Sequence, residues 1–153
     1  MPVHRISAEA TISAPASMVY ATIADYRDGH PLILPRPPFV SLDVEQGGIG
    51  AGTVIRFQMR MLGATRTMRA TISEPEPGRV LVETDVEGKI VTTFTVDPVE
   101  GGQKARVTIA TDMKVHGWPV GWLERRLVTR LLQPVYAREI AQLGAVATDR
   151  AKT

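Results

Sequence analysis

The sequence predicts an α+β fold in which a curved, seven-stranded antiparallel sheet wraps around one long C-terminal helix. The first observation is a helical pattern over residues 119–147, where apolar side chains recur every three or four positions. The second is a series of alternating segments over residues 39–115, separated by glycine and proline turns every 8 to 12 residues or so. The helix would be about 43 Å long, enough to cross a seven-stranded sheet about 29 Å wide.

Composition is that of an ordinary globular protein, and the length suits one domain covering residues 1–153. Hydrophobic residues make up 44% and charged residues 22% of the 153 residues. The chain has no cysteine, which excludes a disulfide framework and agrees with a cytoplasmic location. We expect no membrane span, since no apolar run reaches about 18 residues. The formal net charge of +2 is too small to favour nucleic-acid binding.

The first third of the chain predicts one strand, a short helix and a loop. Residues 3–13 form the strand, because apolar and polar side chains alternate along them. Pro15 fits the first turn of the helix, and Gly29 can cap its C-terminal end. Residues 30–38 contain four prolines, which predicts a rigid irregular loop.

Six further strands are predicted, at residues 39–45, 53–62, 65–73, 79–85, 90–96 and 104–115. Each is separated from the next by a short turn, so neighbouring strands should pair as antiparallel hairpins. Such a sheet has one apolar face and one polar face. It also twists and curls, and the hollow of the curl must be filled. The long helix is the only element large enough to fill it.

The predicted buried stripe of the long helix consists of Leu123, Leu127, Leu131, Val135, Ile140, Leu143 and Ala147. Polar residues such as Glu124 and Glu139 fall beside this stripe and are expected to face solvent. Pro134 removes a backbone hydrogen bond to the carbonyl of Arg130 and predicts a bend. The bend would either follow the curve of the sheet or shape a cavity wall.

Several local motifs accompany this order of elements. Residues 10–15 read Ala-Thr-Ile-Ser-Ala-Pro and precede Val19-Tyr20 and Asp25-Tyr26, while residues 105–109 lead into the helix that starts near Trp118. In these motifs the chain resembles the START / polyketide cyclase superfamily (SRPBCC), which has the helix-grip fold of the birch-pollen-allergen type. The resemblance implies a hydrophobic cavity between sheet and helix, with an entrance near the loop after the first helix. It does not choose between carriers, cyclases, dehydratases and interaction modules.

Apolar faces of the sheet and helix are expected to line this cavity, since such pockets combine apolar walls with a few polar groups. The expected lining residues are Ile55, Phe57, Met59, Met61, Met68, Ile72, Val107, Ile109, Met113, Leu127 and Leu131. Plain core packing explains the same pattern equally well, although the adaptable methionines favour a pocket. Tyr26 and His30 are expected to orient the ligand, and packing of Tyr26 onto the sheet is the alternative.

Acid–base chemistry would require a titratable side chain inside the cavity. His30, His116 and Asp112 are the catalytic candidates, because histidine titrates near neutral pH without help. Exposed positions are the commoner alternative, and the enzyme hypothesis fails if all three face solvent. Glu83 and Asp85 alternate on one strand, where paired carboxylates could serve catalysis but more often face outward. The scattered histidines predict no metal site, and no nucleotide-binding motif predicts a cofactor.

The sequence therefore predicts the binding or transport of a hydrophobic or amphipathic small molecule such as a lipid, polyketide or quinone. A cyclase or dehydratase is the first alternative, and a protein-interaction module with a filled core is the second. Surface arginines, both on the strands (Arg56, Arg60) and on the helix (Arg126), are interpreted as solvated groups, with an acidic partner or anionic lipid as the alternative.

Overall fold

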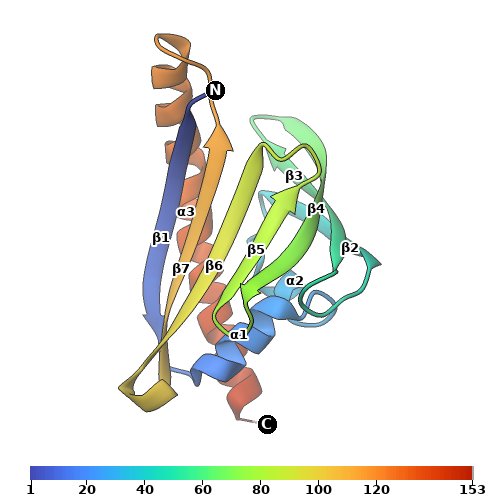
Figure 1. Cartoon of the computed structure of the whole chain (residues 1–153), viewed down its shortest axis with the longest axis vertical. Helices are drawn as coiled ribbons and strands as arrows, with labels where there is room; N and C mark the ends of the chain where they lie inside the picture. Colours follow the sequence, from blue (N-terminus) through green and yellow to red (C-terminus); the bar gives the residue numbers. More distant parts are fainter. Residues whose placement is uncertain (153) are drawn as a thin grey trace.

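Seven strands form one antiparallel sheet in the order β1-β7-β6-β5-β4-β3-β2, and a long helix runs along one face of it (Figure 1). The computed structural model describes residues 1–152. The strands are β1 (Val3–Ile12), β2 (Phe39–Gln46), β3 (Val54–Met61), β4 (Ala64–Glu76), β5 (Val80–Asp85), β6 (Ile90–Val99) and β7 (Lys104–Lys114). The helices are α1 (Ala16–Ala24), α2 (His30–Ile33), a 3-10 turn η1 (Glu100–Gly102) and α3 (Val120–Ala151). The predicted helix-grip fold is confirmed.

Consecutive strands from β2 to β7 pair as hairpins, as the turn residues predict. At the β3–β4 turn, Gly63 has a φ of 78°, a conformation that glycine adopts without steric cost. The first strand then pairs with the last, from Val3 opposite Lys114 to Ile12 opposite Ala105. The first and last strands of the chain are therefore neighbours in the sheet, and both contact α3.

The two halves of α3 have different surroundings. In its C-terminal half, Val135, Ile140, Leu143 and Ala147 are buried as predicted, and the helix contacts β1, α1 and α2. In its N-terminal part, by contrast, Leu123 is 64% exposed. The predicted apolar stripe is therefore buried only where α1 and β1 close against the helix.

Two local predictions differ from the structure. Residues 30–33 form the short helix α2 within the segment predicted as an irregular loop, because Pro31 fits the first turn of a helix. Glu139, predicted to face solvent, is only 3% exposed. Pro134 lies within α3, which continues past it to Ala151. Among the described residues, no helix combines the length and apolarity that crossing a bilayer requires.

Candidate functional site

A cavity of about 570 Å³ lies between the concave face of the sheet and α3. Its volume falls in the range of about 300–1,000 Å³ that small-molecule sites occupy. The residues of α3 that line it run from Glu124 to Glu139, so the cavity lies under the N-terminal half of the helix and the start of its C-terminal half. Its walls are mainly Met, Phe, Leu and Ile side chains.

Most of the predicted ligand-binding residues meet around this cavity. Those that line it are His30, Ile55, Phe57, Met59, Met61, Met68, Met113, Leu127 and Leu131. Ile72, Val107 and Ile109 do not; they lie in the packed core, each less than 5% exposed. The reason is that alternation along a strand reveals which face is apolar, but not which end of that face a helix covers. Here α1 covers part of β6 and β7 and fills the hollow at that end.

The mouth of the cavity lies at a different place from the predicted one. Exposed residues among its lining include Leu62 beside the β3–β4 turn, at 75% exposure, and Leu127 on α3, at 46%. Lys89 and Lys114 also line this end. His30, which follows the first helix, is 2% exposed and therefore lies at the deep end. The entrance was expected near the loop after α1. The structure corrects this expectation, because the opening lies between the β3–β4 turn and α3.

A polar row crosses the otherwise apolar floor of the cavity. Glu83 on β5 pairs with Thr92 on β6, which pairs with Thr111 on β7, so all three side chains share the concave face. The hydroxyls of Thr92 and Thr111 lie 2.8 Å apart, and that of Thr111 lies 2.6 Å from the phenol oxygen of Tyr136 on α3. These groups satisfy one another while lining the space that a ligand would fill.

His30 and Glu83 form a buried pair at the deep end. The Nδ1 of His30 donates to the carbonyl of Ile23 at 2.8 Å, which directs Nε2 toward Glu83, 3.4 Å from Oε1. Burial lowers the pKa of His30, while the Glu83 carboxylate and the carbonyl contact oppose that change. Because Nδ1 already carries a proton, Nε2 is the nitrogen of His30 that can accept a proton beside Glu83, as general acid–base chemistry requires.

Tyr26 supports this pair from behind. Its hydroxyl donates to the same Glu83 oxygen at 2.6 Å, and its ring stacks on His30 with centroids 4.3 Å apart. Burial, and next the charge of Glu83, raise the pKa of Tyr26 well above its ordinary value, so it stays a neutral donor. Tyr26 is fully buried and does not line the cavity. Its place agrees with the alternative of a packing residue, and it acts on the cavity only through Glu83 and His30.

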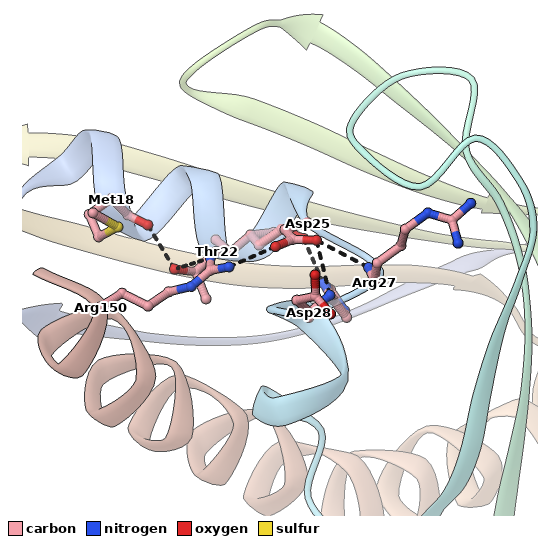
Figure 2. Close-up of polar contacts among 8 residues, drawn as sticks. Met18, Thr22, Asp25, Arg27, Asp28 and Arg150 are labelled. Atoms are coloured by element: carbon pink, nitrogen blue, oxygen red, sulfur yellow. Dashed lines mark hydrogen bonds and ion pairs between the residues drawn. The ribbon is translucent and has the colours of Figure 1, made fainter. Parts of the chain in front are cut away.

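The turn that carries Tyr26 and His30 is tied to the C-terminal end of α3 (Figure 2). The carboxylate of Asp25 accepts hydrogen bonds from the backbone N–H groups of Arg27 and Asp28 and pairs with Arg150 at 2.7 Å. Its backbone carbonyl accepts from the N–H of His30 at 2.6 Å. Burial favours the neutral acid at Asp25, but the hydrogen bonds from Asp28 and Arg150 outweigh it and lower its pKa. The resulting anchor holds the His30 end of the cavity.

Glu139 on α3 is a second carboxyl group of the deep end. It lines the cavity and, among residues 1–152, receives no hydrogen bond or ion pair. Burial, and then the charge of Glu83, raise its pKa well above the ordinary value and favour its neutral form. The outward placement predicted for Glu83 and Glu139 was wrong. Glu139 lies one helical turn from both Val135 and Leu143, and Glu83 lies two residues from buried Leu81 and so on the same strand face. These spacings could have identified both.

The other two catalytic candidates lie outside the cavity. Asp112 is on the outer face of β7, where Arg5 binds both of its oxygens at 2.8 Å and lowers its pKa. His116 is exposed and contacts Glu124 at 2.7 Å. Neither of them lines the cavity. Of the three candidates only His30 points inward, so the condition that would end the enzyme hypothesis is not met.

Comparison with known protein families identifies the family of this chain. Residues 3–148 match the family model described as polyketide cyclase / dehydrase and lipid transport. The chain belongs to this family. The resemblance to the START / polyketide cyclase superfamily is thereby confirmed. No protein of curated function matches the sequence significantly.

Solved structures share the fold of this family member over nearly their whole lengths. The KanY protein is 24% identical, with a TM-score of 0.82 and coverage of 97% of this chain and 99% of that one. The Zhui aromatase/cyclase from a Streptomyces species is 16% identical, with a TM-score of 0.78 and coverage of 97% and 96%. Ara h 8.0201 is 17% identical, with a TM-score of 0.64 and coverage of 93% and 98%. At these identities the likeness concerns the fold alone.

Proposed function

We propose that the protein binds a hydrophobic or amphipathic small molecule, such as a lipid, polyketide or quinone, inside this cavity. The observation that carries the proposal is a cavity of about 570 Å³ with apolar walls and a cluster of polar groups at its deep end. The apolar body of the ligand would lie against the methionines of β3 and β4, and its polar group would lie near Glu83 and Glu139. A protein-interaction module with a filled core is disfavoured by the same cavity.

Burial of apolar ligand surface supplies the binding energy. An apolar area of about 300 Å² removed from water corresponds to about 7.5 kcal/mol at 25 cal/mol per Å². Part of that gain is lost to the immobilisation of the ligand. Micromolar affinity corresponds to about 8 kcal/mol, so hydrogen bonds to the polar groups at the deep end must add to the apolar contribution. Polar groups then decide which apolar molecule fits, because an unmatched buried polar group lowers affinity.

The test combines recovery of a natural ligand with a blocked cavity. Native mass spectrometry of the protein purified from its own host should detect a bound apolar molecule. The variant Met68→Trp fills the cavity and should lose that molecule, whereas Thr67→Trp, which changes the neighbouring exposed residue of β4, should keep it. Equal occupancy in both variants would show that the molecule binds elsewhere.

A cyclase- or dehydratase-type enzyme is the second candidate function, favoured by the buried His30–Glu83 pair. Removal of a proton from a carbon beside a carbonyl group needs a base within reach of that proton, and this pair faces the cavity. The test is exchange of the acidic carbon-bound hydrogens of a 1,3-diketone in D₂O: the base takes the proton and returns a deuteron. Catalysed exchange that is lost in His30→Gln supports the enzyme, and exchange at the uncatalysed rate leaves ligand binding alone.

A further inference from the structure

Glu139 differs from every other polar group at the deep end of the cavity in having no protein partner. Glu83 accepts from Tyr26, and the hydroxyls of Thr92, Thr111 and Tyr136 bond to one another. For Glu139, no donor or acceptor is found among residues 1–152; the residue is only 3% exposed, but it lines the cavity, where an entering molecule can reach its carboxyl group. A buried polar group without a partner is costly, so this carboxyl group is arranged to bond with something that enters the cavity.

The titratable groups around Glu139 bear on its charge. Glu83 faces it from β5, His30 from α2, Tyr136 from its own helix, and Tyr26 lies behind Glu83 and His30. Among residues 1–152, no lysine or arginine lines the deep end; of the basic residues of the cavity, Arg66 and Lys114 lie near the ends of β4 and β7, Lys89 lies in the turn before β6, and all three border the mouth. Burial and the nearby Glu83 both oppose ionisation, so the raised pKa of Glu139 favours the neutral acid.

We propose that Glu139 selects the polar group of the ligand by donating its carboxyl O–H to a carbonyl oxygen, so that the cavity takes ketones or quinones in preference to ionised molecules. This inference rests on the proposed binding function and names its ligand class. A neutral carboxyl group has one O–H to donate, and a carbonyl oxygen only accepts. A carboxylate ligand would meet the charge of Glu83. An ammonium ligand would lose its hydration among methionine, phenylalanine and leucine side chains.

The experiment uses four probes of one shape: 2-ethylnaphthalene, 2-acetylnaphthalene, 2-naphthoate and 1-(2-naphthyl)ethylamine. Their affinities for the purified full chain are measured by calorimetry or by naphthalene fluorescence. We expect 2-acetylnaphthalene to bind about 3- to 10-fold more tightly than 2-ethylnaphthalene, the range that one hydrogen bond supplies. Both ionised probes should bind more weakly than the ketone.

Two variants and a pH series identify the donor. Glu139→Leu should abolish the preference for the ketone while leaving 2-ethylnaphthalene bound, whereas Glu139→Gln should keep the preference because its amide N–H also donates. The neutral form of an acid with a raised pKa exists below that pKa, so the preference of the native protein should fall as the pH rises through it. In Glu139→Gln, the preference should not change in that range.

Several outcomes would overturn the proposal. Equal affinity for ketone and hydrocarbon, tightest binding of the amine, or a ketone preference that survives in Glu139→Leu would each exclude carbonyl selection by Glu139 and leave the binding function intact. Failure of all four probes to bind would count against the binding function itself, and against this inference with it. If Glu139→Leu does not fold, Glu139→Gln and the pH series still decide.

Discussion

Replacement of Glu139 by leucine should stabilise the empty protein. The carboxyl group of Glu139 is buried and has no partner among residues 1–152, and an unsatisfied buried polar group costs about 1–3 kcal/mol. Leucine has a similar volume, lacks the polar atoms and suits a helix. We therefore expect the free energy of unfolding to rise by about 1–3 kcal/mol. For a chain of this length each kcal/mol corresponds to a rise in Tm of about 2–4 °C.

The stabilisation should grow with pH. In the unfolded chain Glu139 ionises near its ordinary value of 4.5, whereas in the folded protein burial and the charge of Glu83 hold its pKa well above that value. A raised folded-state pKa contributes stability below 4.5 and loses it as the pH rises toward the folded pKa. Between these two pKa values, the advantage of Glu139→Leu should increase by about 1.4 kcal/mol per pH unit.

Urea denaturation at several pH values measures both effects, with the m-value checking that unfolding stays two-state. The control is Arg138→Leu, which changes the adjacent, exposed residue of α3 and should give neither the gain nor the pH trend. A Glu139→Leu variant that is less stable than the native protein at every pH would show that a partner satisfies Glu139. A constant difference across the pH range would show that its pKa is not raised.

Three further predictions concern the groups around the site. Tyr26→Phe removes the hydroxyl that donates to Glu83 and should cost about 1–3 kcal/mol in urea denaturation; an unchanged midpoint would mean that Glu83 has another donor. Asp25→Ala removes the ion pair between Asp25, which is 14% exposed, and Arg150, which is 31% exposed. This variant should be less stable by about 1–3 kcal/mol and should show faster hydrogen exchange at the His30 amide. Because the pKa of Asp25 is lowered in the folded protein, the stability that Asp25 contributes should disappear only as the pH falls through that lowered value. Asp112→Asn should leave ligand binding unchanged and shift stability by less than about 1 kcal/mol, and a loss of binding would contradict its placement on the outer face.

The candidate site was only partly predictable from the sequence. The apolar faces of β3 and β4 were recognisable from strict alternation, and Phe57, Met59 and Met68 do line the cavity. The two carboxyl groups of the deep end, Glu83 and Glu139, were assigned to solvent because charged residues usually are exposed. The spacing of each glutamate from buried residues of the same element indicates an inward-facing side chain. The prediction instead followed the general rule that charged residues are exposed. Acids that face an internal cavity are exceptions to that rule, and exceptions of this kind accompany binding sites.

Local periodicity determined the order and type of the elements. A two-residue period shows which strand face is apolar, and a spacing of three to four residues shows the stripe of a helix, because both follow from backbone geometry alone. The helix-grip fold could therefore be predicted from residue patterns and family motifs. What lies opposite an apolar face depends on contacts between residues far apart in the chain, and local patterns do not contain it. Only the tertiary structure decided that α1 fills one end of the concave face, around Ile109, and leaves the other end hollow beneath Leu127.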